Sequence, residues 1–279
     1  MTSKYIVSPK WLHSNLDREN IVVLDASLKP VSATDSDNSS CIIPGAKKFD
    51  IKNVFSDKNS LYDSMMPDEA IFIEEIRKLG INQDSIIVLY DSQGIYSSPR
   101  AWFMIRSLGH KEVYVMDGGL PEWMRSGFST EESYGMNTEY GNFSVTEKIT
   151  YFCNADYVAS GLQYNDRHII DARSASRFSG IEPEPREGLN LGHIPGAVNL
   201  PFSKVLDGNG YKDSATLSEI FRSVSNKEKE FIFSCGSGIT ACIPALAAIM
   251  CGYPDVKIYD GSWSEWGDAS NNYPVELHG

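Results

Sequence analysis

Short runs of apolar residues alternate along this chain with longer segments of helical period. The runs are rich in Ile, Val, Leu and Phe and lie at residues 21–24, 86–89, 169–170 and 231–233. Residues 67–79 have the period of an amphipathic helix, with Phe72 and Ile76 on one face. Gly80 follows at a position where a glycine commonly ends a helix. Strands that alternate with helices predict an α/β fold in which a parallel sheet is flanked by helices on both faces.

Four landmarks of the first half of the chain return in the same order in the second half. The first two are a strand that ends in Asp-Ala, at Asp25 and Asp171, and an Ile-Pro-Gly-Ala turn, at Ile43 and Ile194. The other two are the end of a second strand, at Asp91 and Cys235, and a Trp after an Asp-Gly turn, at Trp123 and Trp266. The members of each pair are 143 to 151 residues apart, which indicates an internal duplication. We therefore predict two like domains, at residues 1–128 and 151–279.

Residues 129–150 between the two copies are polar and irregular, without a helical period. We interpret them as a linker. Tyr134, Tyr140 and Phe143 give this linker aromatic anchors, so we expect it to pack against the protein surface and not to act as a loose tether.

Cys235 is the candidate nucleophile. It follows the strand-like run 231–233 and opens a short loop made of Gly236, Ser237, Gly238, Ile239 and Thr240. An apolar, helix-like segment follows, so the thiol is expected among free backbone N–H groups at the positive end of a helix dipole, both of which stabilise a thiolate. Only the thiolate attacks or coordinates. An inert buried cysteine is the alternative, but two glycines and two hydroxyl residues in this loop are poor core material.

Other kinds of cysteine site fit this loop less well. Cysteine phosphatases place an arginine six residues after the cysteine to hold the phosphate dianion, and here that position is Ala241. Cys235, Cys242 and Cys251 are too widely and irregularly spaced for a metal site. We predict neither a metal nor another cofactor. Asp91 stands in the first copy where Cys235 stands in the second, so the N-terminal domain is predicted to lack a nucleophile.

Composition limits the partners and the location. The formal net charge of −12 argues against binding to nucleic acid or an anionic membrane, because both require a basic surface. Five irregularly spaced cysteines favour reduced thiols in the cytoplasm over a disulfide framework. The first residues lack an apolar signal core, and the longest apolar stretch, 239–251, is shorter than the roughly 20 residues that span a bilayer. We expect a cytoplasmic protein without nucleic-acid or membrane partners.

The tandem halves and their motifs resemble the two-domain rhodanese sulfurtransferases over essentially the whole chain. The motifs are the His-Ile-Pro-Gly-Ala turn at 193–197, the Asp-Gly turns at 117 and 260, and the single cysteine loop. Within this family a Cys-Gly-Ser-Gly-x-Thr loop is similar to that of the 3-mercaptopyruvate sulfurtransferases, whereas thiosulfate sulfurtransferases usually carry basic residues directly after the cysteine. A loop without cationic side chains suits the monoanion 3-mercaptopyruvate better than the small dianion thiosulfate.

The resemblance implies a mechanism and a set of site residues. Sulfur would pass from 3-mercaptopyruvate through a Cys235 persulfide to a thiol, thioredoxin or cyanide acceptor, with release of pyruvate. Ser237 matches the family's loop serine, which passes a proton or binds the leaving sulfur. Arg177 and Arg186 match two arginines that hold the substrate carboxylate and carbonyl. The backbone amides of Gly236, Ser237, Gly238, Ile239 and Thr240 are implied to hold the persulfide.

Three alternatives stay open. Arg177 and Arg186 could instead form surface salt bridges with the acidic residues Glu182, Glu184 and Glu187. The protein could be a thiosulfate sulfurtransferase, or it could be a non-catalytic sulfur relay or binding module.

The first domain departs from the family pattern at two positions. Where relatives usually carry an acid and a histidine, this chain has Lys52 and Ser64. Asp50 and Asp63 are candidate replacement acids, and Lys52 is a candidate for stabilising a thiolate or an enolate. Arg100 is a further candidate for substrate contact from the first domain.

We hypothesise that the loss of the histidine weakens proton transfer. Ser64→His is then expected to raise the turnover of 3-mercaptopyruvate, because a histidine titrates near neutral pH and can carry a proton. Steady-state release of pyruvate measures this effect, and an unchanged turnover would reject the hypothesis.

Overall fold

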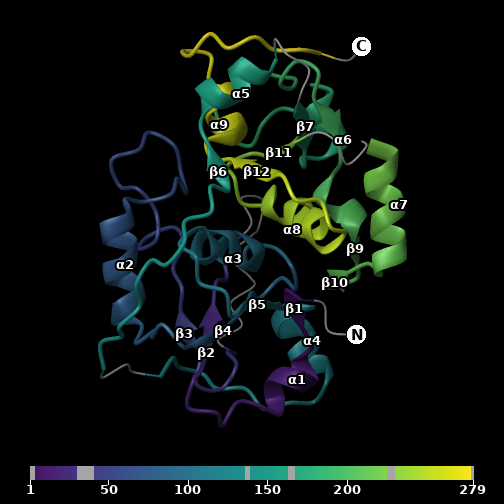
Figure 1. Cartoon of the computed structure of the whole chain (residues 1–279). Coiled ribbons are helices and arrows are strands. Elements are labelled where there is room, and N and C mark those ends of the chain that lie inside the picture. The colour runs from purple at the N-terminus through teal and green to yellow at the C-terminus, as the bar shows by residue number, and fades with distance from the viewer. Residues whose placement is uncertain (1–3, 30–40, 136–138, 163–166, 225–229, 278–279) are drawn as a thin grey trace. The chain divides into compact units, whose positions relative to one another are not determined.

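The computed structural model describes residues 4–29, 41–135, 139–162, 167–224 and 230–277 (Figure 1). The chain divides into two compact units. Unit 1 comprises residues 1–58, 66–149 and 208–211, and unit 2 comprises residues 59–65, 150–207 and 212–279. Two short segments, 59–65 and 208–211, therefore cluster with the other half of the chain.

Unit 1 contains a five-stranded sheet. Its strands are β1 (Ile6–Val7), β2 (Ile21–Asp25), β3 (Lys47–Lys48), β4 (Ile86–Tyr90) and β5 (Val113–Met116). Its helices are α1 (Pro9–His13), α2 (Glu69–Lys78), α3 (Ser98–Ser107) and α4 (Gly119–Arg125). The strands lie in the order β1-β5-β4-β2-β3, and the pairings along this order are parallel. The predicted parallel sheet is thus confirmed in this unit.

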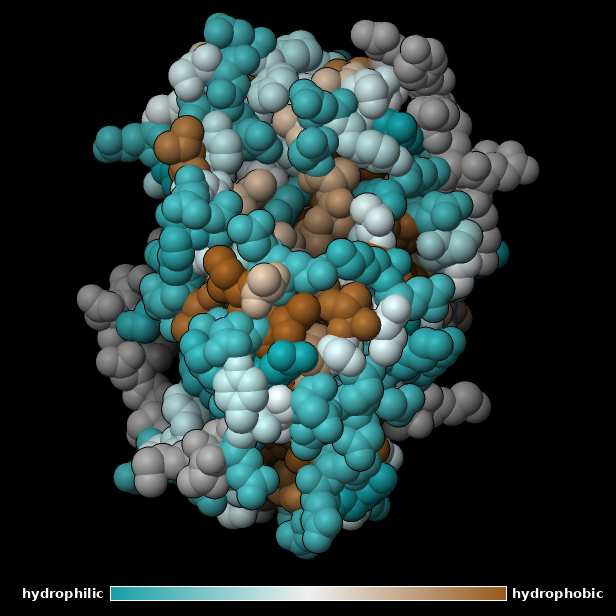
Figure 2. Space-filling view, turned by 60° about the vertical axis from the view of Figure 1, so that its left-hand side comes forward, coloured by the Kyte–Doolittle hydropathy of each residue, from teal (hydrophilic) through white to brown (hydrophobic). Residues whose placement is uncertain are grey.

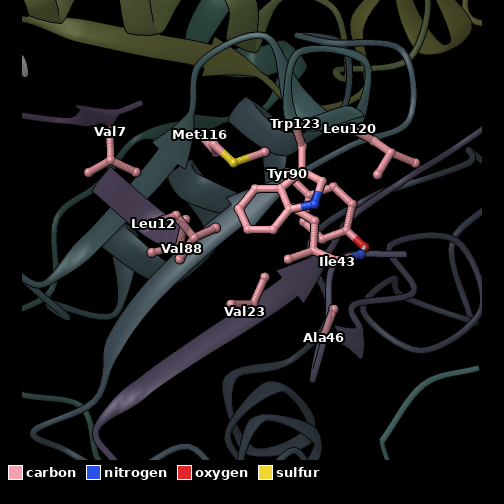
Figure 3. Close-up of a cluster of buried hydrophobic side chains, with 10 residues drawn as sticks. All are labelled: Val7, Leu12, Val23, Ile43, Ala46, Val88, Tyr90, Met116, Leu120 and Trp123. Carbon is pink, nitrogen blue, oxygen red and sulfur yellow. Dashed lines mark hydrogen bonds between the residues drawn. The ribbon is translucent and has the colours of Figure 1, made fainter. Parts of the chain in front are cut away.

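Both faces of this sheet are buried. Val88 and Tyr90 of β4 point to one face, where they pack in a cluster with Trp123 of α4 (Figure 3). Leu12 of α1 belongs to the same cluster. Ile87 alternates with these residues along β4, so it faces the opposite side, and it is also fully buried. Helix α3 packs against β4 and β5. Burial on both faces explains why these strands are continuously apolar in the sequence.

Helix α2 agrees with the periodicity of the sequence. Phe72 and Ile76 are its buried residues. Gly80 has a φ of 69°, a left-handed conformation that glycine adopts without steric cost after the last turn of a helix. The predicted apolar face and end of this helix are therefore confirmed.

Unit 2 repeats the topology of unit 1. Its sheet strands are β6 (Phe152–Cys153), β7 (Arg167–Asp171), β8 (Val198–Asn199), β11 (Glu230–Ser234) and β12 (Val256–Tyr259). Its helices are α5 (Ala155–Gly161), α6 (Ala175–Phe178), the 3₁₀ helix η1 (Phe202–Val205), α7 (Ser214–Val224), α8 (Cys242–Met250) and α9 (Ser262–Trp266). The two-residue strands β9 (Leu206–Asp207) and β10 (Gly210–Tyr211) lie between η1 and α7 in the sequence.

The order β6-β12-β11-β7-β8 matches the order in unit 1 strand for strand, and its pairings are parallel. Trp123 and Trp266, which the sequence marks as equivalent, are both fully buried at the ends of α4 and α9. The shared topology confirms the internal duplication and the α/β fold.

Most of the protein surface in Figure 2 is formed by hydrophilic residues. The apolar stretch 239–251 becomes the buried helix α8, as its length predicts. In the described part of the chain, no helix combines the length and the apolar character needed to cross a bilayer.

The predicted linker packs along unit 1. Phe143 is fully buried, and its backbone N–H donates to the carbonyl of Ile81 at 3.1 Å. Its carbonyl accepts from the side chain of Arg77 at 2.8 Å. The Tyr134 hydroxyl donates to the carboxylate of Asp25 at 2.6 Å. These contacts agree with the expectation that aromatic anchors hold this segment to the surface.

Phe143→Ala is expected to lower the free energy of unfolding of unit 1 by about 3–4 kcal/mol, because it removes a fully buried ring and leaves a cavity. Urea unfolding followed by circular dichroism measures the change. Tyr140→Ala is the matched control, because Tyr140 is 56% exposed, and it should cost less than about 1 kcal/mol. Equal losses for the two variants would contradict the anchoring role of Phe143.

Candidate active site

Cys235 directly follows β11 and precedes the loop that leads into α8. β11 lies between β7 and β12, so the cysteine stands at the carboxyl end of an interior strand, where open α/β sheets bind their ligands. Its side chain is almost fully buried, with 1% of the residue exposed. The strand, cysteine, loop and helix therefore occur in the predicted order.

The first turn of α9 fixes the backbone of Cys235. The N–H of Trp263 donates to the Cys235 carbonyl at 2.9 Å. The N–H of Cys235 donates to the hydroxyl of Ser262 at 3.1 Å. Both the N–H and the hydroxyl of Ser264 donate to the carbonyl of Gly236, at 2.9 and 2.6 Å. These bonds hold the start of the loop in one conformation, which presents the thiol in a fixed direction.

The equivalent loop of unit 1 holds an anion of its own. Asp91 follows β4 and is fully buried. One carboxylate oxygen accepts from the backbone N–H groups of Tyr96, Ser97 and Ser98 at 2.9 to 3.0 Å, and from the Ser98 hydroxyl at 2.7 Å. The other oxygen accepts from the N–H of Gln93 at 3.0 Å. A strand-to-helix loop of this length thus surrounds a negative charge with backbone donors.

The loop of unit 2 has the same length and the same flanking elements. Helices α3 and α8 begin at Ser98 and Cys242, each seven residues after the residue at the strand end. Gly94 and Gly238 occupy equivalent positions and both have positive φ, at 106° and 72°. We infer that the amides of the Cys235 loop are likewise directed at an anion, here a sulfur.

Two arginines lie beside the cysteine loop. Arg177, on α6, places one terminal nitrogen 3.2 Å from the position that a Cβ would take on Gly236. A terminal nitrogen of Arg186 lies 3.7 Å from the same position. Gly236 directly follows Cys235, so the two guanidinium groups converge next to the nucleophile. A Cβ at position 236 would lie in contact with both of them.

A buried ion-pair network holds Arg177. The Glu184 side chain is 3% exposed and accepts from Arg177 Nε at 3.1 Å and from a terminal nitrogen of the same guanidinium. Glu184 also accepts from Arg173 at 2.7 Å. Arg173 in turn pairs with Asp171, and its guanidinium lies 4.2 Å from the ring centre of Trp263. Arg173 is thus a structural residue.

The charge of Arg173 is stabilised within this network. Burial disfavours its cation, but the neighbouring Asp171 and Glu184 carboxylates outweigh this and raise the pKa of Arg173. Arg173 therefore stays charged between Asp171 and Glu184.

His193 braces the turn that supports α6. Its ring is fully buried and stacks on Phe178 with ring centres 3.7 Å apart. Its Nδ1 lies 2.7 Å from the Phe178 carbonyl oxygen. These contacts assign His193 a structural role in the turn.

Comparison with known proteins identifies the family of this chain. The model of the rhodanese-like domain matches residues 8–126 and 154–269. The chain belongs to the rhodanese family. It is 37% identical to the 3-mercaptopyruvate sulfurtransferase of Escherichia coli K12, over 99% of both chains. It is also 37% identical to the thiosulfate sulfurtransferase of Gallus gallus, over 94% of this chain and 92% of that one. The crystal structure of SseA from Escherichia coli matches 95% of this chain and all of that one, with a TM-score of 0.83 and 34% identity.

The remaining predicted loop residues of this rhodanese differ in exposure. Gly238 and Ile239 are buried, whereas Ser237 and Thr240 are half-buried. The Sγ of Cys242 donates to the Gly238 carbonyl at 3.3 Å, which helps to close the loop.

Asp63 was expected as a contribution from the first domain, but its segment, 59–65, clusters with unit 2. Its carboxylate lies 3.5 Å from a terminal nitrogen of Arg186. Tyr62 is held in the same unit, since its hydroxyl accepts from the Asn271 side chain at 2.8 Å. Ser64 is buried and has a φ of 66°. Long-range contacts of this kind have no signal in a single sequence.

Two further candidates belong to unit 1. Lys52 is exposed in a turn, and Arg100 is fully buried in α3. Their catalytic roles stay predictions.

The site also contains residues that the sequence did not single out. Ser262 lies in the Asp-Gly-Ser-Trp segment 260–263 and Ser264 directly follows it. In the sequence this segment served as a landmark of the duplication and of the family resemblance, without a role for either serine. Glu184 was considered only as a surface partner of the arginines. Of the other thiols, Cys153 has its pKa raised to about 12 by burial, so it stays protonated at neutral pH. Among the described residues, no cluster of His, Cys, Asp or Glu is arranged to hold a metal ion.

Asp91→Asn is expected to destabilise unit 1 by about 3 kcal/mol, because an amide nitrogen would face backbone donors that now bind a buried carboxylate. Asp84→Asn is the control, since Asp84 is exposed six residues before β4 ends. Urea unfolding of the two variants measures the difference. Equal midpoints would show that the loop does not depend on this anion.

Proposed function

We propose that this rhodanese-family protein is a sulfurtransferase that takes sulfur from 3-mercaptopyruvate, carries it as a Cys235 persulfide and releases pyruvate. The relatives confirm the family expectation of sulfur transfer. The observation that carries the choice of donor is the pair Arg177 and Arg186 beside Gly236, in a loop that has no cationic side chain of its own.

In the first half of the reaction, the Cys235 thiolate attacks the sulfur of 3-mercaptopyruvate. An S–S bond forms and the C–S bond breaks, and its electron pair leaves with the carbon as the pyruvate enolate. Protonation of the enolate gives pyruvate. Cys235 is left as a persulfide, whose negative charge the loop amides stabilise.

The arginine pair supports binding of a 2-oxo acid. A planar guanidinium can donate two parallel hydrogen bonds to a carboxylate and hold it in one orientation. Glu184 binds Nε and Nη2 of Arg177, and Nη2 is also the atom near Gly236. Each terminal nitrogen of a guanidinium carries two N–H groups, so the second N–H of Nη2 can still donate to a substrate beside Arg186. Ser237 lies two residues after the nucleophile, and its half-buried hydroxyl is the group we assign to proton transfer or to the leaving atoms.

In the second half of the reaction an acceptor thiolate attacks the outer sulfur of the persulfide and restores the Cys235 thiolate. We propose a small thiol or a thioredoxin-like protein as the acceptor, which gives double-displacement kinetics. We also propose a cytoplasmic location, which the five free cysteines support.

Thiosulfate is the second candidate donor, because the Gallus gallus relative is a thiosulfate sulfurtransferase. The same two arginines could attract a dianion. The uncharged loop favours 3-mercaptopyruvate, since a small dianion gains more from a cation directly beside the sulfur.

Wild-type protein is expected to release pyruvate from 3-mercaptopyruvate with a higher kcat/KM than it forms thiocyanate from thiosulfate and cyanide. Cys235→Ser should abolish both activities, because serine cannot form a persulfide. Coupled pyruvate detection and a thiocyanate assay measure the two rates.

Cys251→Ser is the matched control, because Cys251 lies in the same unit at the far end of α8 and is only half-buried. It should retain activity. A preference for thiosulfate would overturn the choice of donor. If wild type turned over neither donor, a sulfur relay or binding module would replace the proposed enzyme.

A further inference from the structure

Glu184 is an acid with an almost fully enclosed side chain close to the Cys235 loop. Its side chain is 3% exposed, and both carboxylate oxygens accept hydrogen bonds from guanidinium groups. One oxygen is shared by Arg173 and Arg177, and the other accepts from Arg177. Glu184 therefore fixes the orientation of Arg177 through two bonds to one planar group.

Arg173 anchors this network on the side that faces away from Gly236. Arg173 donates to the carboxylate of Asp171 at 2.6 to 3.1 Å and to the Gly192 carbonyl at 2.8 Å. It also lies over the Trp263 ring. Glu184 thus connects the buried Arg173 to Arg177. The Arg177 side chain is 21% exposed and borders Gly236.

The charges of this network cancel. Asp171 and Glu184 contribute two negative charges, and Arg173 and Arg177 contribute two positive charges. Arg186 remains as the cation beside Gly236, and its partner Asp63 is more distant, at 3.5 Å, and 54% exposed. An exposed pair of this kind neutralises less than a buried one. The net charge of these side chains beside Gly236 is therefore close to +1.

We propose that Glu184 is a positioning and specificity-determining residue, which holds Arg177 beside Gly236 and neutralises it so that the site favours a monoanionic sulfur donor over a dianionic one. The proposal rests on the proposed function. It adds that donor choice depends on a buried acid behind the arginines as well as on the uncharged loop.

Glu184→Gln tests the role of the charge. The variant keeps the shape and most hydrogen bonds, and Arg173 keeps Asp171 as a partner, but the network gains one positive charge. The ratio of kcat/KM for thiosulfate to kcat/KM for 3-mercaptopyruvate is expected to rise about tenfold, because a dianion gains about 1.4 kcal/mol more than a monoanion from one added charge at this range.

Glu182→Gln is the matched control. It makes the same change in net charge two residues away, but Glu182 is exposed and accepts from the Ser176 hydroxyl. Its ratio of the two kcat/KM values, which we call the donor ratio, should stay within about twofold of wild type, because exposed charges are screened. A Glu184→Gln ratio equal to that of Glu182→Gln would overturn the charge role.

Glu184→Asp tests positioning separately. The carboxylate is kept but retracted by one methylene, so Arg177 should move and the KM for 3-mercaptopyruvate should rise several-fold, while the donor ratio stays below that of Glu184→Gln. Wild-type constants for both donors would overturn the positioning role, even where Glu184→Gln does not fold. A ratio shift as large as in Glu184→Gln would overturn the charge role.

Wild type is measured with both donors in the same experiment. Turnover of neither donor by wild type would reject the proposed function itself. Cys235-dependent turnover of 3-mercaptopyruvate, with identical donor ratios in wild type, Glu182→Gln and Glu184→Gln, would reject only the inference about Glu184.

Discussion

Unit 1 depends on one interaction, the binding of an anion by backbone N–H groups where a buried strand turns into a helix, and unit 2 repeats the strand, loop and helix that make this interaction possible. Unit 1 provides its own anion, the Asp91 carboxylate, which accepts four backbone bonds. Unit 2 places Cys235 at the equivalent strand end. Backbone donors cannot be lost by mutation of a side chain, so this feature can persist in both copies while the residue at the strand end changes.

The residue at that position decides what each copy does. A carboxylate attached to the chain satisfies the donors permanently and makes the loop a structural element. In unit 2 a sulfur atom stands at this position, and we propose that it accepts and gives up a second sulfur. The duplicated fold can therefore separate stability from chemistry: the buried Asp91 stabilises one loop, and the α9 contacts to Cys235 and Gly236 stabilise the other.

Much of this arrangement could be predicted from the sequence because its signals are local. Apolar runs predicted the strands, and the repeated landmarks predicted the duplication. The glycine-rich loop predicted where Cys235 lies, and the family resemblance identified Arg177 and Arg186. Other features arise from contacts between distant residues. Ser262 supports Cys235 across 27 residues, and Glu184 is buried only because Arg173 is anchored beneath it, although its local sequence resembles an exposed acidic segment.

The overall negative charge of the protein means that an anionic donor must be attracted by charges close to the site. A protein with a formal net charge of −12 repels anionic donors, but at physiological ionic strength this repulsion is screened beyond about 8 Å. In the site that we propose, capture of the donor therefore depends on nearby charges, those of Arg177 and Arg186 close to Gly236. Glu184 neutralises much of the charge of Arg177 but keeps the guanidinium in place. Donor recognition in the proposed site therefore depends more on directed hydrogen bonds than on attraction between net charges. Directed bonds distinguish a carboxylate beside a carbonyl from a compact dianion, which net charge alone cannot do.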